Sequence, residues 1–228
     1  MCGTESLKSI PVNGLVLHYL EKGEGRPVVL VHGNGESHEI FETEISQLCA
    51  SGYHVFALDS RGHGANEPLQ EYHYADMAED VFQFIQKLGL QRPYLYGHSD
   101  GGIIALLLEI KHPGTLGKMA ISGTNLSPDG LDRDFLEECR RINQDSPNPL
   151  ITLILTEPHI APSDLNLIGI PVLVTVGEKD LILRSETDTI VSSLPHAHLK
   201  VIQGADHGSY IVHSPVMGEL LVPFFNAD

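Results

Sequence analysis

The sequence predicts an α/β fold, with a mainly parallel β-sheet covered by helices on both faces. Short β-branched runs alternate along the chain with longer segments whose apolar residues have helical spacing. The strand candidates are nearly continuous apolar runs such as "PVVLVH" and "IPVLVTV", and such runs are typical of parallel strands buried on both faces. With 228 residues, 42% of them hydrophobic, the chain predicts a single domain over residues 1–228.

The predicted elements follow one another in regular alternation. Gly52 and Gly89 are expected to end two of the helices, because glycine readily adopts the left-handed conformation found there. We expect strands at residues 15–21, 27–32, 53–59, 93–96, 118–122, 170–176 and 199–202. We expect helices at residues 40–50, 74–88, from the turn at Ser99 through 110, and at 215–225.

One segment interrupts the alternation. Residues 125–169 contain no good strand candidate, and their charged and proline-punctuated sequence favours two short helices, at residues 131–144 and 150–156. Ligands of open parallel sheets bind beyond the carboxyl ends of the strands. We therefore predict that this insertion forms a short helical lid over those ends.

Charge and composition exclude several classes of function. The formal net charge of −16 disfavours nucleic acid and anionic membrane surfaces as partners. Three cysteines, Cys2, Cys49 and Cys139, suit free thiols in a reducing compartment. No signal peptide or membrane-spanning run is evident, so we expect a cytoplasmic protein. No cofactor motif or metal-ligand pattern is found, and the sequence leaves monomer and homodimer open.

The segment "LYGHSDGGIIALL" places a serine between glycines where a strand gives way to a helix. A strand–turn–helix of the form Gly-x-Ser-x-Gly can hold a serine in a strained, exposed conformation suited to a nucleophile. The start of the helix adds a positive dipole end that favours a nearby oxyanion. We therefore predict that Ser99 is a nucleophile.

A serine hydroxyl needs a base, and the base needs a carboxylate to orient it. "GADHGSY" follows the last strand and makes His207 the candidate base, with His213 as the alternative. "VGEKD" follows the strand at 170–176 and makes Asp180 the candidate acid, with Glu178 as the competitor.

An oxyanion site requires backbone N–H donors near the nucleophile. We expect one donor from Asp100, which follows the serine, and the other from Asn34 in the "HGNG" turn, with the Asn34 side chain free to face the pocket. Residues expected to line the substrate pocket share an apolar side chain or a place near these loops. They are His32, Ile103, Phe135, Leu136, Leu150, Leu153 and Tyr210.

Taken together, the motifs "HGNG", "DSRGHG", "GHSDGG", "GEKD" and "GADHG" occur in the order that resembles the α/β-hydrolase fold superfamily. The resemblance covers residues 15–225 and is strongest to small-cap serine hydrolases, carboxylesterase-like or proline iminopeptidase-like. It implies a sheet of about eight strands and a scaffold role for Asp59, Arg61 and His63. Asn66 stands where the family often has serine. Epoxide hydrolases and haloalkane dehalogenases of this fold use aspartate at the elbow, so Ser99 argues against both.

These residues predict a serine hydrolase that cleaves a small ester through an acyl-enzyme on Ser99, with His207 as general base and Asp180 as the orienting acid. Amide or peptide bonds, as in proline iminopeptidase-like enzymes, and C–C bonds are alternative targets of the same residues. A ligand-binding receptor with very slow turnover is an alternative of another class.

Overall fold

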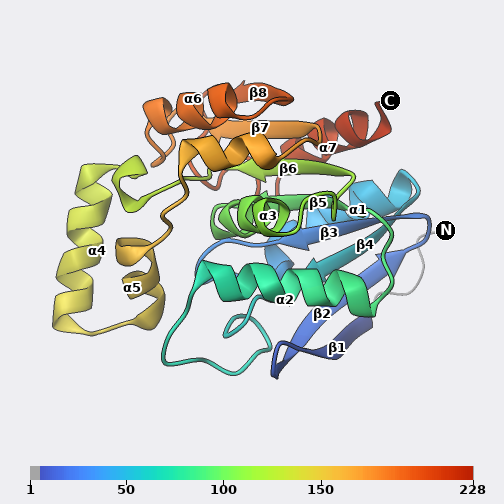
Figure 1. Cartoon of the computed structure of the whole chain (residues 1–228), viewed down its shortest axis with the longest axis horizontal. Coiled ribbons are helices and arrows are strands. Elements are labelled where there is room, and N and C mark those ends of the chain that lie inside the picture. Colours follow the sequence, from blue (N-terminus) through green and yellow to red (C-terminus); the bar gives the residue numbers. More distant parts are fainter. Residues whose placement is uncertain (1–5, 228) are drawn as a thin grey trace.

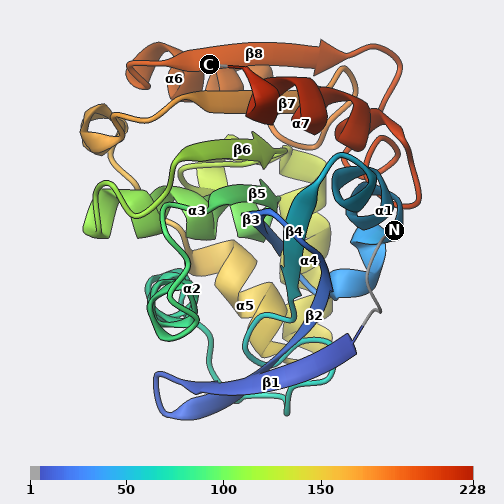
Figure 2. The same cartoon turned by 90° about the vertical axis from the view of Figure 1, so that its right-hand side faces the viewer.

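The computed structural model describes residues 6–227, and they form one eight-stranded sheet with helices on both faces (Figures 1 and 2). The strand order is β1-β2-β4-β3-β5-β6-β7-β8. The first two pairings, β1 with β2 and β2 with β4, are antiparallel, and all the others are parallel. The predicted α/β fold and its eight-stranded, mostly parallel sheet are confirmed.

The strands are β1 (Ser6–Val12), β2 (Leu15–Gly23), β3 (Arg26–Val31), β4 (Tyr53–Leu58), β5 (Tyr94–His98), β6 (Lys118–Ser122), β7 (Val172–Gly177) and β8 (Ala197–Ile202). The α-helices are α1 (Glu42–Ala50), α2 (Tyr74–Lys87), α3 (Asp100–Lys111), α4 (Arg133–Asp145), α5 (Pro149–Thr156), α6 (Arg184–Ser193) and α7 (Val216–Asn226). Short 3₁₀ helices lie at His38–Phe41, Pro128–Gly130 and Pro162–Leu167.

One of the strands and one of the α-helices are absent from the sequence prediction. Strand β1 lies at the edge of the sheet, and only Val12 of it is buried, so its apolar pattern is weak. Helix α6, "RSETDTIVSS", is polar and β-branched and buries only Thr187 and Ile190. Both elements are held by tertiary contacts rather than by a strong local pattern.

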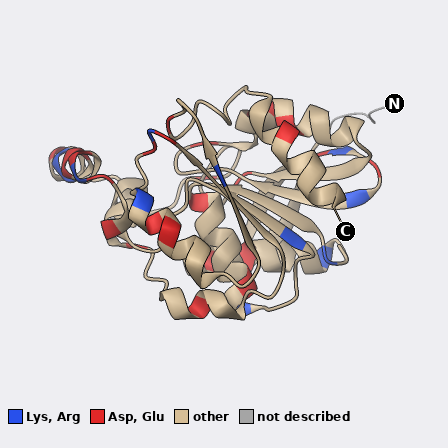
Figure 3. Ribbon diagram, turned by 90° about the horizontal axis from the view of Figure 1, so that it is seen from above, with Lys and Arg blue, Asp and Glu red and all other residues tan. Residues whose placement is uncertain are grey.

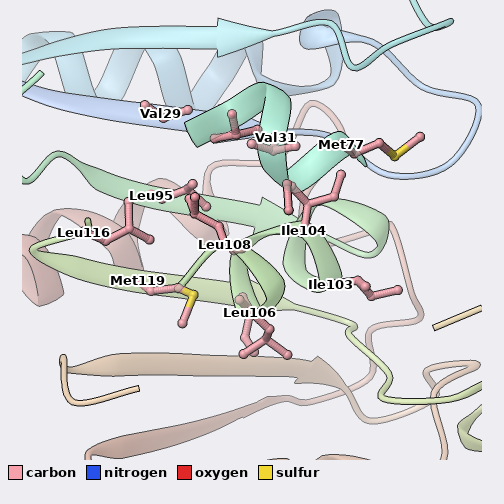
Figure 4. Close-up of a cluster of buried hydrophobic side chains, with 14 of the residues drawn as sticks. Val29, Val31, Met77, Leu95, Ile103, Ile104, Leu106, Leu108, Leu116 and Met119 are labelled. Carbon is pink, nitrogen blue, oxygen red and sulfur yellow. The ribbon is translucent and has the colours of Figure 1, made fainter. Parts of the chain in front are cut away.

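Two apolar clusters flank the sheet. One packs α2, α3 and α6 against one face, and it includes Leu108 of α3 together with Val29, Val31 and Leu95 of the strands (Figure 4). The other packs α1 and α7 against the opposite face. Gly102 of α3 lies close to the segment that follows β6, because a Cβ on this residue would lie 1.9 Å from Oγ1 of Thr124. The sheet is thus covered on both sides, as its apolar strands require.

The insertion between β6 and β7 forms the helices α4 and α5, which lie together at one end of the molecule (Figure 1). They begin within two residues of the predicted starts. A small apolar cluster of Leu131, Leu136 and Ile182 joins the insertion to the loop after β7. The outer surface of α4 carries acidic and basic residues together (Figure 3). We call α4 and α5 the cap.

The remaining scaffold predictions can be placed as well. Asp59 accepts hydrogen bonds from the backbone of His38 and Ala65, and Arg61 binds the carboxylate of Asp80. The hydrogen bond to Ala65 lies within the loop after β4, and those with His38 and Asp80 connect this loop to neighbouring segments. Cys49 and Cys139 are buried and form no disulfide in the described chain, and Cys2 lies outside the described residues. No helix within residues 6–227 is long and apolar enough to cross a bilayer.

Glu44 is fully buried between α1 and the sheet. Burial raises its pKa to about 8, because no other residue in the described part of the chain donates a hydrogen bond to its carboxyl group. In the unfolded chain the carboxyl ionises near its ordinary pKa of about 4.3. Between these two pH values unfolding releases a proton, so rising pH favours the unfolded state.

We predict that Glu44→Gln makes stability less sensitive to pH. The advantage of the variant over the wild type grows from pH 5 to pH 8 by at most about 4 kcal/mol, at about 1.4 kcal/mol per pH unit. Urea denaturation at pH 5, 6.5 and 8 measures it. Glu42→Gln is the matched control, because the Glu42 side chain on the same helix is 81% exposed. Equal pH dependence in the two variants would contradict the prediction.

Candidate active site

Ser99 occupies a tight turn between β5 and α3. Its backbone has φ 52° and ψ −115°, a conformation that costs a non-glycine residue about 1–3 kcal/mol. Neighbouring glycines allow the turn to close. A Cβ on Gly101 would lie 1.9 Å from the carbonyl oxygen of Val31, and a Cβ on Gly97 would lie 2.2 Å from the carbonyl oxygen of Gly101. The amide of Ser99 donates to the carbonyl of Ser122 at 2.7 Å. The serine is therefore held at the carboxyl end of the sheet.

His207 and Asp180 lie in line with this serine. Nε2 of His207 is 3.0 Å from Oγ of Ser99, and its Nδ1 is 2.7 Å from Oδ1 of Asp180. Because the Asp180 carboxylate accepts, Nδ1–H of His207 donates to it, and Nε2 is left to accept the serine proton. The structure therefore brings the three predicted residues together as one hydrogen-bonded chain.

The Asp180 carboxylate is only 1% exposed. Burial opposes its ionisation, but hydrogen bonds from His207 and from the amides of Ile182 and Gly177 outweigh that effect and lower the pKa of Asp180 below its usual value. An ionised Asp180 stabilises an imidazolium at His207. Asp206 next to His207 instead accepts from the amides of Gly208 and Ser209 and shapes the loop.

The alternative candidates lie elsewhere. Glu178 accepts from the amide of Gly204 at 2.7 Å, and His213 faces Glu42 at 3.9 Å with most of its side chain exposed. Among the hydrogen bonds and ion pairs of residues 6–227, none joins Glu178 or His213 to Ser99 or His207.

Asn34 and Asp100, which are predicted to supply the oxyanion donors, both line the cavity that contains Ser99 and His207. The backbone amides of Asn34 and Asp100 have no hydrogen-bond partner within the described chain. His32 stabilises the turn at Asn34 through two hydrogen bonds. Its Nδ1 is 2.7 Å from the carbonyl oxygen of Gly33, and its Nε2 accepts a hydrogen bond from the amide of Ser60. Burial lowers the pKa of His32 to about 4, so the imidazole is neutral and can do both.

The Asn34 side chain differs from the prediction. Its Nδ2 donates to Oδ2 of Asp100 at 3.0 Å and to the carbonyl of Leu150 in the cap at 3.3 Å, so it is not free. Asp100 also accepts from the Tyr74 hydroxyl at 2.7 Å. Burial raises the pKa of Asp100, and the bonds from Tyr74 and Asn34 act in the opposite direction.

The cavity in front of Ser99 has a volume of about 220 Å³, below the 300–1,000 Å³ of typical ligand pockets. Its apolar wall comes from the cap and the loop after β7, and consists of Leu131, Phe135, Ile154 and Leu181. Its polar wall includes Glu36, Tyr74, Asn125 and Glu157. No cluster within residues 6–227 has three or more histidine, cysteine or carboxylate groups placed to hold a metal ion.

Among the residues expected to line the pocket, only Phe135 does so. The other six side chains pack elsewhere. His32 contacts the backbone of the turn at Asn34, and Leu136 belongs to the small cluster with Leu131 and Ile182. Ile103, Leu150 and Leu153 pack in the cluster of α2 and α3, and Tyr210 packs in the cluster of α1 and α7. The missed lining residues include Glu36, which follows the "HGNG" turn and could have been inferred from its place after β3. Glu157 gave no sequence signal, because the position of α5 depends on tertiary packing.

Comparisons with known proteins agree with this fold. Residues 26–138 match the model of the alpha/beta hydrolase fold family. The human serine hydrolase BPHL is 26% identical over 248 residues, which cover 94% of this chain and 84% of that protein. The structure of 2-hydroxy-6-oxo-6-phenylhexa-2,4-dienoate hydrolase from Rhodococcus sp. strain RHA1 superposes with a TM-score of 0.79 at 21% identity, covering 98% of this chain and 99% of that one.

Rat bifunctional epoxide hydrolase 2 is 29% identical over 155 residues, 67% of this chain. The match spans only 27% of that larger protein. The eight-stranded sheet, the turn at Ser99 and these likenesses define an α/β hydrolase fold. The chain belongs to the α/β-hydrolase superfamily.

Gly123, just after β6, lies beneath the His207 ring. Its φ is +57°, and a Cβ there would lie 2.7 Å from Cε1 and 2.8 Å from Nδ1 of His207. We predict that Gly123→Ala displaces the imidazole and slows the labelling of Ser99 by a fluorophosphonate about 100-fold, because small misplacements of a reacting group have effects of this size.

Gly114→Ala separates backbone strain from this displacement. Gly114 also has a positive φ, +82°, but a Cβ there meets nothing within 4 Å. We expect this control to lose some stability and to label at the wild-type rate. Equal labelling rates in the two variants would show that Gly123 does not position His207.

Proposed function

We propose that this protein is a serine hydrolase that cleaves small carboxylic esters. The observation that carries the proposal is the hydrogen-bonded chain Asp180–His207–Ser99 at a cavity that Asn34 and Asp100 also line. The small cavity and its apolar cap wall favour a compact acyl or alcohol group.

In the proposed reaction, Oγ of Ser99 attacks the ester carbonyl while Nε2 of His207 takes the serine proton. The amides of Asn34 and Asp100 stabilise the oxyanion of the tetrahedral intermediate. As the C–O bond to the alcohol breaks, His207 returns the proton to the leaving oxygen. Water then attacks the acyl-enzyme with His207 again as base, releasing the acid and regenerating Ser99.

The decisive experiment treats the folded protein with a fluorophosphonate and measures its intact mass. We expect a single adduct on the wild type and none on Ser99→Ala, because only an activated serine reacts readily. The absence of an adduct on the folded wild type would reject the proposal. A panel of esters, aminoacyl anilides and a dienoate then distinguishes ester, amide and C–C cleavage.

We also predict that Asp180→Asn lowers kcat for ester hydrolysis about 10³–10⁴-fold, because an amide leaves His207 in the wrong tautomer. Thermal denaturation checks that the variant folds, since Asp180 also accepts from two backbone amides. Glu178→Gln is the matched control: this carboxylate lies two residues away but contacts Gly204 instead. A loss in Asp180→Asn no larger than in the control would contradict the role of Asp180.

A further inference from the structure

Within the described part of the chain, the cavity at Ser99 is lined by acidic side chains and by no lysine or arginine. The three carboxyl groups at its wall, beside the Asp180 of the hydrogen-bonded chain, belong to Glu36, Asp100 and Glu157. A substrate that carries a carboxylate would meet like charges there without a compensating cation, whereas a positive charge would be favoured. The charge of the substrate is therefore a property that this cavity can discriminate.

Two of the three carboxyl groups already have partners on both oxygens. Asp100 accepts from Tyr74 and Asn34. Glu157 lies 2.6 Å from Nδ1 of His73 and accepts from the amide of Tyr74 at 3.0 Å. These groups are engaged in holding the cap and the loops in place.

Glu36 differs from them. Its Oε2 accepts from the amide of Gly33 at 2.8 Å, and its Oε1 has no hydrogen-bond partner within residues 6–227. His98 lies 3.9 Å from Oε2, but burial lowers the pKa of His98 to about 3, so this imidazole is neutral and does not compensate the charge. Burial also raises the pKa of Glu36, and the hydrogen bond from the Gly33 amide acts in the opposite direction. A cation bound to Glu36 would hold it ionised.

The Glu36 carboxylate is close to the reacting atoms. A Cβ on Gly33 would be 2.7 Å from Oε2 of Glu36 and 3.1 Å from Cβ of Ser99, so both side chains lie next to the same point beside Gly33. An ionised Glu36 at this place opposes the oxyanion that forms during the proposed reaction. A positive charge on the substrate beside it lowers the energy of the carboxylate and of the oxyanion together.

We propose that Glu36 makes this active site selective for esters that carry an ammonium group next to the scissile carbonyl, and against esters that carry a carboxylate there. This inference rests on the proposed ester hydrolysis. Glu36 is in this view a specificity-determining residue, and the acyl-transfer steps on Ser99 are unchanged.

The test uses three methyl esters that differ in one group on the carbon next to the carbonyl. Alanine methyl ester carries an ammonium, methyl isobutyrate a methyl and monomethyl methylmalonate a carboxylate. At pH 6.5 the ammonium stays protonated. The ratios of kcat/KM between esters are compared for the wild type and for Glu36→Gln, so that intrinsic differences in ester reactivity cancel. Gln can still accept from the Gly33 amide.

We expect the ammonium-to-methyl ratio to fall about tenfold in Glu36→Gln, and the carboxylate-to-methyl ratio to rise, because one charge-assisted contact is worth an effect of this order. Glu39→Gln removes a charge from the same loop at an exposed position outside the cavity. Both ratios should stay at their wild-type values in that control.

The outcomes separate this inference from the proposed function. Hydrolysis of methyl isobutyrate with the same ratios in the wild type and in Glu36→Gln overturns the role of Glu36 and leaves ester hydrolysis standing. No hydrolysis of any ester, with no fluorophosphonate adduct, overturns both.

If Glu36→Gln does not fold, inhibition constants on the wild type replace it. Alaninamide should inhibit more strongly than isobutyramide, and methylmalonamate least. Equal inhibition by the three compounds overturns the proposal.

Discussion

The contact of Gly101 with the end of β3 determines the geometry of the whole site. A Cβ at Gly101 would lie 1.9 Å from the Val31 carbonyl and 2.9 Å from that of His32, so α3 can begin where it does only because this residue is glycine. The residues that follow Val31 form the turn that carries the Asn34 amide. One close contact between backbones therefore sets the position of the serine and of the proposed oxyanion donor relative to each other, and it explains why the strain at Ser99 is tolerated.

The order of the parallel strands brings the other groups to the same place. Strands β3, β5, β6, β7 and β8 are neighbours in the sheet, and their carboxyl ends lie along one edge. Ser99 follows β5, and β6 supplies the carbonyl of Ser122 that accepts from its amide. Asp180 follows β7 and His207 follows β8. Residues more than one hundred positions apart meet because each stands directly after a strand.

This geometry also explains what could be read from the sequence. Ser99, Asp180 and His207 can be found in the sequence from their residue types and from their positions directly after apolar strands. Neither of these two properties depends on how side chains pack. The residues that line the pocket do depend on side-chain packing. Helix α5, "PLITLILT", is apolar on nearly every side, so its sequence does not say which face meets the substrate. The structure turns Ile154 to the cavity and buries Leu153 against the main core.

Asn34 connects three parts of the site that the sequence treats as separate. It lines the cavity together with Asp100, and its side chain donates both to the Asp100 carboxylate and to the Leu150 carbonyl at the start of α5. Asp100, the turn at Asn34 and the cap are thus joined through one amide side chain. Because hydrogen bonds of this kind fix orientation as well as distance, a displacement of α5 is transmitted to the turn on which the proposed oxyanion contact depends. The short cap is therefore connected to the turn at Asn34 by a hydrogen bond, in addition to supplying Phe135 and Ile154 to the wall of the cavity.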